Sequence, residues 1–115
     1  MQKIMTVGPH KIGPADLITS RLGQAVGLMF SRQRDLIFVL PRERTLIMHM
    51  LFVFYPIDVV LLDNRQEIVE LKPGFRPFSF YRLRRKARYI LELKNSTIEK
   101  HGLKLGDKIS LEKAG

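Results

Sequence analysis

One carboxylate, that of Asp58, lies in the middle of an otherwise apolar stretch. The stretch runs from residue 49 to residue 63 and consists almost entirely of large hydrocarbon side chains. An ionised carboxylate is expensive to bury unless hydrogen-bond donors or a cation compensate it. Asp58 is therefore either a structural acid, held by backbone amides or by an arginine such as Arg21, Arg32 or Arg42, or a cleft acid with a raised pKa. We favour the structural interpretation.

The cleft interpretation groups several residue types that could carry chemistry. His49 and Asp58 would be its catalytic candidates, and Met29, Arg32 and Met50 would complete its lining. A lone histidine on a strand is more often hydrogen-bonded in place than catalytic. Thioethers suit monovalent copper, but without cysteine or a histidine pair the methionines are better explained by core packing. The sequence therefore predicts no metal site and no cofactor.

A second candidate is the basic and aromatic segment from residue 78 to residue 89. Five cations and no acid fall within it, and they are Arg82, Arg84, Arg85, Lys86 and Arg88. Arginine and lysine bind phosphates and aromatic rings stack on bases, so such a segment could bind single-stranded nucleic acid. An acidic protein is another possible partner. The alternative is a solvated strand face with Phe78, Phe80 and Tyr89 in the core.

The elements that would position these residues are mostly strands. Apolar runs and alternating patterns predict strands at 3–7, 36–40, 45–54, 57–62, 67–71, 87–94 and 108–111. The clearest local prediction is a hairpin of 59–62 with 68–71, with Asn64 in a left-handed turn position. Residues 13–14 (Gly-Pro) are expected to break the chain, and residues 42–44 to form a charged turn.

Two short helices are predicted from spacing and capping signals. An amphipathic pattern predicts one over about residues 19–25. Ser96 followed three residues later by Glu99 is a capping-box signature, and Gly102 would end that helical turn. Within the strand before it, Glu92 is expected on the polar face with Arg88 and Lys94.

Together these elements predict a mainly β fold, a compact antiparallel β-barrel or sandwich with one or two short helices. At 115 residues the chain is expected to form a single domain, residues 1–115. Residues 1–16 would be an N-terminal extension that could add an edge strand.

Composition narrows the partners and the location. A net charge of +9 favours anionic partners such as nucleic acid, an acidic protein or anionic lipid, and general solubility is an equally weighted alternative. The absence of cysteine excludes disulfides and thiolate chemistry. The apolar run from 45 to 62 is long enough for a membrane helix, but His49, Pro56 and Asp58 would be costly at that depth, so no membrane span is predicted. No signal-peptide pattern opens the sequence, which favours a cytoplasmic protein.

Five phrases in order resemble the domain-of-unknown-function family number 192. They are Gly27-Leu28-Met29-Phe30, then residues 36–40, then His49-Met50 with Pro56-Ile57-Asp58, then residues 89–93, and finally Gly102 with residues 105–109. The resemblance covers 18–111 and implies a small, mostly antiparallel β fold of bacteria and archaea, in an archaeal-like variant, without an established activity. The family's usual tryptophan-methionine pair and following polar residues read His49 to Val53 here, so a polar site at those positions in relatives would be altered or absent.

The sequence thus favours a non-enzymatic binding or interaction module for an anionic partner, nucleic acid or acidic protein, that uses residues 82–88 as its contact. A ligand-binding or hydrolytic domain with a cleft near His49 and Asp58 is the first alternative. A structural accessory domain is the second.

Overall fold

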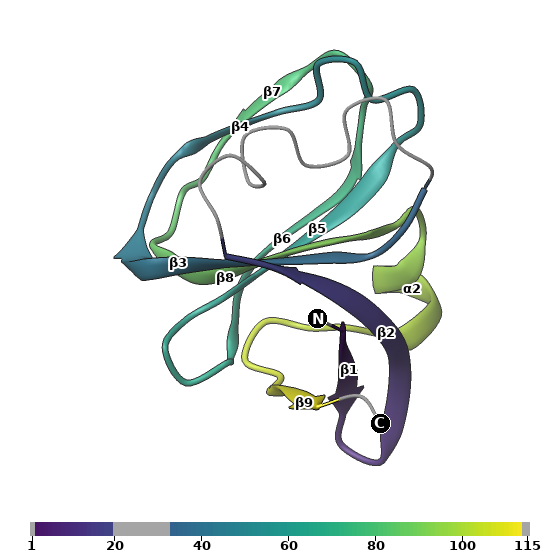
Figure 1. Ribbon diagram of the computed structural model, residues 1–115, viewed down its shortest axis with the longest axis vertical. Helices are drawn as coiled ribbons and strands as arrows, with labels where there is room; N and C mark the ends of the chain where they lie inside the picture. The colour runs from purple at the N-terminus through teal and green to yellow at the C-terminus, as the bar shows by residue number, and fades with distance from the viewer. Residues whose placement is uncertain (1, 20–32, 114–115) are drawn as a thin grey trace.

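A mainly β architecture is confirmed by the computed structural model, which describes residues 2–19 and 33–113 (Figure 1). Its helix is α2 (Thr97–His101). Its strands are β1 (Gln2–Val7), β2 (His10–Ile18), β3 (Leu36–Arg44), β4 (Ile47–His49), β5 (Ile57–Leu62), β6 (Ile68–Phe75), β7 (Phe80–Arg82), β8 (Ala87–Lys94) and β9 (Ile109–Lys113).

Seven of these strands form one curled sheet in the order β6-β5-β8-β3-β2-β1-β9, a half-barrel. Its two edge strands approach one another where β6 and β9 begin. There the Ile68 amide donates to the Asp107 carbonyl at 2.8 Å, and the Ile109 amide donates to the Gln66 carbonyl at 2.9 Å. Strands β4 and β7 form a separate two-stranded sheet at one end of the molecule (Figure 1).

Most strand pairs are antiparallel, as expected, but β2 and β3 run parallel, with Asp16 to Ile18 opposite Leu36 to Phe38. A parallel pair cannot be joined by a tight turn, because the chain must return to the same end of the sheet. The long connection between these two strands makes that return possible. The predicted helix over residues 19–25 falls almost entirely in this connection, outside the described residues.

The core lies on both faces of the central strands. Along β5, Ile57, Val59 and Leu61 belong to one buried cluster, whereas Val60 and Leu62 belong to the other. Every residue of β5 is buried. A strand buried on both faces has no reason to alternate between polar and apolar residues, which explains the nearly continuous apolar run in the sequence.

Two of the expected strand limits are wrong. The strand predicted for residues 45–54 is only the three residues of β4, because the chain turns at Phe52, which has a positive φ of 58°. Residues 42–44 belong to β3 instead of forming a turn. Sequence pattern alone could not separate these cases, since apolar residues also line the loop after β4.

The N-terminal segment also differs from expectation. Gly13 and Pro14 do not break the chain but lie within β2, opposite Met5 and Ile4 of β1. β1 is not an edge strand, because it pairs with β2 on one side and with β9 on the other. Met5 is fully buried, so this strand contributes to the core.

The predicted hairpin and the C-terminal helix are confirmed, with changes in detail. Strands β5 and β6 pair as expected, but the left-handed residue of their turn is Gln66 instead of Asn64. Gly102 ends α2 with a φ of 60°. Ser96 has a φ of 72° and makes no capping hydrogen bond through its side chain, so the capping box is absent.

Candidate functional site

Asp58 lies on β5 and is a buried acid, because only 1% of the residue is exposed. Its Oδ1 accepts a hydrogen bond from the Gly74 amide at 3.0 Å, and its Oδ2 accepts one from the Ile98 amide at 2.8 Å. The second bond satisfies an amide in the first turn of α2, where the Ser96 side chain makes no bond. Asp58 therefore caps a helix that is distant in sequence and also fixes the end of β6.

Of the other residues expected in the cleft, the structure describes His49 and Met50, and both lie apart from Asp58. Asp58 alternates with Val60 and Leu62 and so faces the cluster of those residues, whereas Met50 belongs to the cluster on the other side of β5. His49 lies on β4 in the small sheet, and its Nδ1 accepts a hydrogen bond from the Leu51 amide at 3.2 Å. Met29 and Arg32 lie outside the described residues.

A second buried acid, Glu92, was not singled out from the sequence. It lies on β8 opposite Leu36 of β3 and Val59 of β5. Only 6% of the residue is exposed, so the expectation that it lies on a polar face is wrong. Burial raises the pKa of Glu92 to about 8. The signal that could have found it is the apolar run on each neighbouring strand, because a strand between two buried strands is itself buried on both faces.

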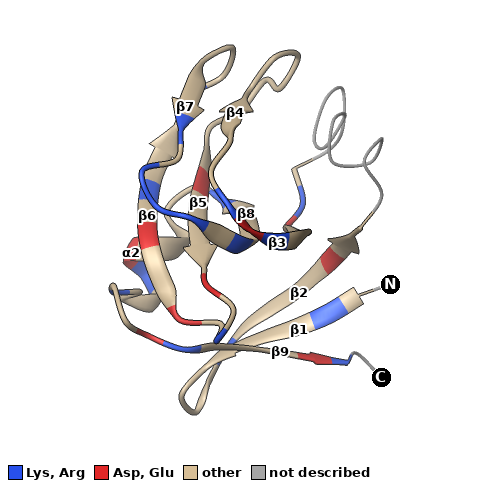
Figure 2. Ribbon diagram, turned by 90° about the vertical axis from the view of Figure 1, so that its left-hand side faces the viewer, with Lys and Arg blue, Asp and Glu red and all other residues tan. Residues whose placement is uncertain are grey.

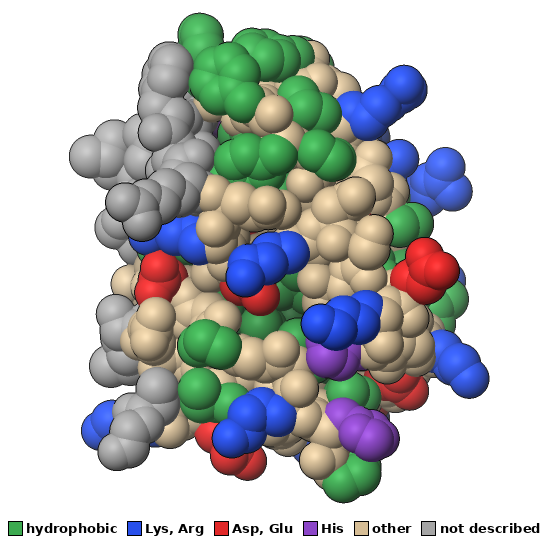
Figure 3. All heavy atoms as spheres, turned by 90° about the vertical axis from the view of Figure 1, so that its right-hand side faces the viewer, with side chains coloured by type: hydrophobic (Ala, Val, Ile, Leu, Met, Phe, Trp, Pro, Cys, Tyr) green, Lys and Arg blue, Asp and Glu red, His purple; other side chains and the backbone are tan. Residues whose placement is uncertain are grey.

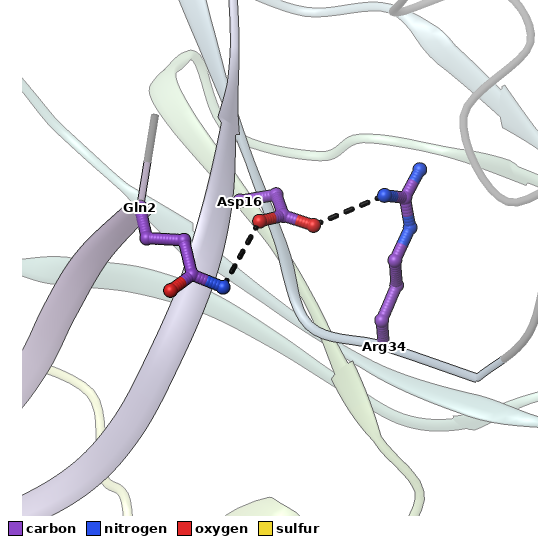
Figure 4. A network of polar contacts seen from close by, with 3 residues as sticks. All are labelled: Gln2, Asp16 and Arg34. Atoms are coloured by element: carbon purple, nitrogen blue, oxygen red, sulfur yellow. Dashed lines mark hydrogen bonds and ion pairs between the residues drawn. The ribbon is translucent and has the colours of Figure 1, made fainter.

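A groove of about 480 Å³ lies between β2, the start of β3 and α2. Asp16 accepts hydrogen bonds there from Gln2 at 3.3 Å and from Arg34 at 3.0 Å, the second being an ion pair (Figure 4). Asp35 accepts one from the Lys94 amide at 2.9 Å, and burial raises its pKa although that bond and the Lys94 and His101 charges lower it. Each of the two acids therefore already has donors within the groove, which is typical of a structural network.

The cations predicted to bind an anionic partner gather where β7 joins β8. Figure 2 shows this connection as a basic stretch of the chain. The exposed members are Arg82, Arg84, Arg85 and Lys86, which we call the basic loop. Among residues 2–19 and 33–113, no carboxylate lies within ion-pairing distance of any of them.

A single buried acid, Glu70 of β6, fixes the backbone of the basic loop. Its Oε1 accepts hydrogen bonds from the amides of Arg84 at 3.0 Å and Arg85 at 2.8 Å, and its Oε2 accepts one from the Tyr81 hydroxyl. Burial, together with this carboxylate, raises the pKa of Tyr81 to about 12. Because Glu70 binds backbone amides instead of guanidinium groups, it leaves both arginine side chains exposed.

Arg88 differs from the other four cations. It lies on β8 and is partly buried, and its guanidinium donates to the Leu40 carbonyl and to Asn64 Oδ1. Two of its N–H donors are thus already used within the fold and are not free for a partner. We therefore separate Arg88 from the basic loop, although the sequence placed all five cations in one group.

Hydrophobic side chains gather on the surface at the end of the molecule that carries β4 and β7 (Figure 3). Six exposed residues form this apolar end, and they are Ile47, Leu51, Phe52, Phe54, Phe78 and Phe80. The alternative that Phe78 and Phe80 lie in the core is wrong, because these side chains are 51% and 64% exposed. Contiguous exposed apolar surface commonly marks an interaction site.

Two residues of the apolar end have strained backbones. Phe52 and Phe78 each have a φ of 58°, in the left-handed region that bulky residues rarely adopt. Such a conformation costs about 1–3 kcal/mol per residue and tends to occur at functional sites. Glycine would relieve the strain at both positions, but the two phenylalanine rings pack against one another with their centres 6.3 Å apart.

These features define a small half-barrel β protein that exposes a basic loop and an apolar end. The chain belongs to domain-of-unknown-function family 192, described as an uncharacterised ACR family, which matches residues 4–111. Relatives include UPF0127 proteins of Pyrococcus furiosus, 39% identical over 73% of this chain and 74% of that protein, and Thermococcus sibiricus, 39% identical over 67% of this chain. The match spans 51% of the Thermococcus protein, about half its length.

Two solved structures share the fold. One, described as a putative transcription regulator of Sinorhizobium meliloti, has a TM-score of 0.85 at 21% identity and covers 96% of this chain and 92% of its own. The other, a protein of unknown function from Novosphingobium aromaticivorans, has a TM-score of 0.80 at 19% identity and covers 94% of this chain and 83% of its own. At these identities the likeness is one of fold.

Two further findings concern membrane-spanning helices and metal sites. No helix in residues 2–19 or 33–113 has the length and hydrophobicity needed to traverse a bilayer. The same part of the chain holds no group of three histidine, aspartate or glutamate side chains arranged to bind a metal ion.

Proposed function

We propose that this protein is a binding module for an anionic macromolecule and that the basic loop is its contact surface. The observation that carries the proposal is that Arg82, at the end of β7, and Arg84, Arg85 and Lys86, in the short connection after it, are exposed and form no ion pair with a carboxylate among the described residues. Four uncompensated cations on one connection create a local positive potential that attracts anions.

The hydrogen bonds of Glu70 support the same proposal. Binding normally costs the entropy of ordering the loop that makes the contact, and a loop already held in place avoids part of that cost. Here two consecutive backbone amides, those of Arg84 and Arg85, are held by one buried carboxylate. The fold therefore uses a buried acid to present two arginines, an arrangement that solubility alone would not require.

The hydrogen bonds of Asp58 and Glu70 favour the basic loop over the cleft near His49 and Asp58 as the functional site. Both Asp58 oxygens accept backbone hydrogen bonds that hold the fold together. Glu70, by contrast, holds backbone groups whose side chains remain available. A binding role therefore needs no rearrangement of the fold. Catalysis by Asp58, by contrast, would require its hydrogen bonds from the Gly74 and Ile98 amides to break.

The test is chromatography on heparin, a generic polyanion, eluted with a salt gradient. A variant with Arg84→Gln, Arg85→Gln and Lys86→Gln should elute at lower salt than the wild type, because binding to a polyanion depends on the number of ion contacts. The matched control carries Lys104→Gln, Lys108→Gln and Lys113→Gln, which remove the same number of exposed charges elsewhere. If both variants elute together, the retention reflects net charge alone and the proposal fails.

A further inference from the structure

Arg82, the first residue of the basic loop, shares one face of the small sheet with Ile47 and Phe80 of the apolar end. In the antiparallel pair of β4 and β7, Ile47 lies opposite Arg82 and His49 lies opposite Phe80, while Met48 lies opposite Tyr81. Residues opposite one another point to the same side of a sheet. Met48 is buried and faces the core, so Ile47, Phe80 and Arg82 face outward together. A partner that touches this face meets hydrocarbon and positive charge at once.

The phenylalanine rings are packed as a hydrocarbon cluster. Phe78 contacts Phe54 with ring centres 5.4 Å apart at 70°, and it contacts Phe52 at 6.3 Å and 75°. Stacking of nucleic-acid bases needs an open ring face parallel to the base. Edge-to-face contacts with two neighbours leave Phe78 poorly suited to that role. Ile47 and Leu51, which have no ring, extend the same patch.

Charge and position argue for a lipid surface over a protein groove. The small sheet lies at one end of the molecule (Figure 1), and its exposed side chains combine phenylalanine and aliphatic groups with arginine next to them. This is the composition of surfaces that insert apolar side chains into the boundary between headgroups and acyl chains while cations contact lipid phosphates.

We infer that the apolar end docks on a membrane surface that contains anionic lipids, with the rings entering the interface and the basic loop contacting phosphate headgroups. This rests on the proposed function, of which it names the partner. Phe54 and Phe80 are each 64% exposed and supply much of the apolar contact. Arg84 and Arg85 supply the electrostatic contact. Docking of this kind is peripheral and reversible.

The experiment measures sedimentation of the full chain with two kinds of vesicle, phosphatidylcholine alone and phosphatidylcholine mixed with phosphatidylglycerol. The wild type should bind the mixed vesicles and bind the neutral ones weakly. The double variant Phe54→Ser and Phe80→Thr should bind the mixed vesicles at least about tenfold more weakly, because two rings no longer leave water. Arg84→Gln with Arg85→Gln should weaken the same binding by about fivefold per charge, increasingly masked as salt rises.

Leu105→Ser is the matched control for the rings. Leu105 is 65% exposed, as much as Phe54 or Phe80, but it lies in the connection between α2 and β9. It should leave vesicle binding unchanged. Thermal unfolding of all variants should stay near that of the wild type, since the substituted side chains are mostly exposed.

The heparin and vesicle results together separate the two proposals. If the wild type is retained on heparin through the basic loop but does not bind mixed vesicles, the lipid inference is wrong and the proposed function stands. If the ring variant binds vesicles as well as the wild type does, the inference is also wrong. If the ring variant instead loses affinity for a single-stranded oligonucleotide, the rings stack on bases and the partner is nucleic acid.

Discussion

Asp58 shows how one buried acid can hold distant parts of a chain. Its two oxygens join β5 to the amides of Gly74 and Ile98, so the carboxylate acts as a helix cap supplied from another element. Ser96 occupies the sequence position expected for that cap but adopts a left-handed conformation. A capping signature in sequence assumes that the local side chain is the nearest acceptor, and here a buried acid takes that place.

The variant Asp58→Ala should lower the free energy of unfolding by about 2–4 kcal/mol, because it leaves two buried amides without an acceptor. Urea unfolding followed by circular dichroism measures the change. Asp16→Ala is the control, since the Asp16–Arg34 pair is exposed and should contribute no more than about 1 kcal/mol. Equal losses in the two variants would contradict the role assigned to Asp58.

Glu92 should make the stability depend on pH. Its pKa is raised to about 8 in the folded protein from 4.5, so between these values the folded state keeps a proton that the unfolded state releases. The free energy of unfolding should therefore fall as pH rises through this window, by at most about 1.4 kcal/mol per pH unit. Thermal unfolding at a series of pH values measures the slope.

Glu92→Gln removes this titration and should flatten the slope, with the largest gain in melting temperature above the folded pKa. Part of the slope should remain, because burial also raises the pKa of Asp35. Tyr55 is a titratable neighbour of Glu92, because burial and the charge of Glu92 both raise the pKa of the Tyr55 hydroxyl. Parallel curves for variant and wild type would show that Glu92 is not the group responsible.

At the scale of elements, the connection between β7 and β8 depends on β6. Glu70 accepts hydrogen bonds from the Arg84 and Arg85 amides and from the Tyr81 hydroxyl, so one strand fixes both the loop and the strand before it. Leu83 lies buried within the same connection, and its amide donates to the Leu46 carbonyl at 3.0 Å. The loop is thus anchored at several points while its cations stay exposed.

Glu70→Ala should speed hydrogen exchange at the Arg84 and Arg85 amides, since each loses its acceptor, and should destabilise the fold by about 1–3 kcal/mol. Exchange followed by nuclear magnetic resonance measures both amides. The Leu83 amide is an internal control because its acceptor is a backbone carbonyl. Glu70→Gln, which keeps one acceptor oxygen, should have a smaller effect. Unchanged exchange at Arg84 and Arg85 would mean that the loop is held by other contacts.

At the scale of the whole molecule, the half-barrel separates two kinds of surface. The groove beside α2 holds acids that are already hydrogen-bonded to nearby donors. The end with β4 and β7 holds exposed rings, and the basic loop, from the end of β7 onward, holds cations that pair with no carboxylate in the described part of the chain. The net charge of +9 describes the chain as a whole but does not say where the potential is concentrated. That distribution, more than the total charge, supports a directed contact.

The sequence by itself determined the fold class, the central strands and the hairpin of β5 with β6, because buried strands require apolar runs and turns require particular residues. It also singled out Asp58 as a buried acid, since its carboxylate lies in the middle of the apolar run. These features depend on local pattern, which a sequence states directly.

Only the tertiary structure decided which residues share a surface. The sequence pattern predicted Glu92 on a polar face, and one alternative placed Phe78 and Phe80 in the core. In the structure Glu92 is buried and both phenylalanine rings are exposed. The tertiary structure also made Glu70 the anchor of the basic loop, a contact between residues on different strands. Burial is set by what packs on each face of a strand, and that depends on neighbours far away in the chain.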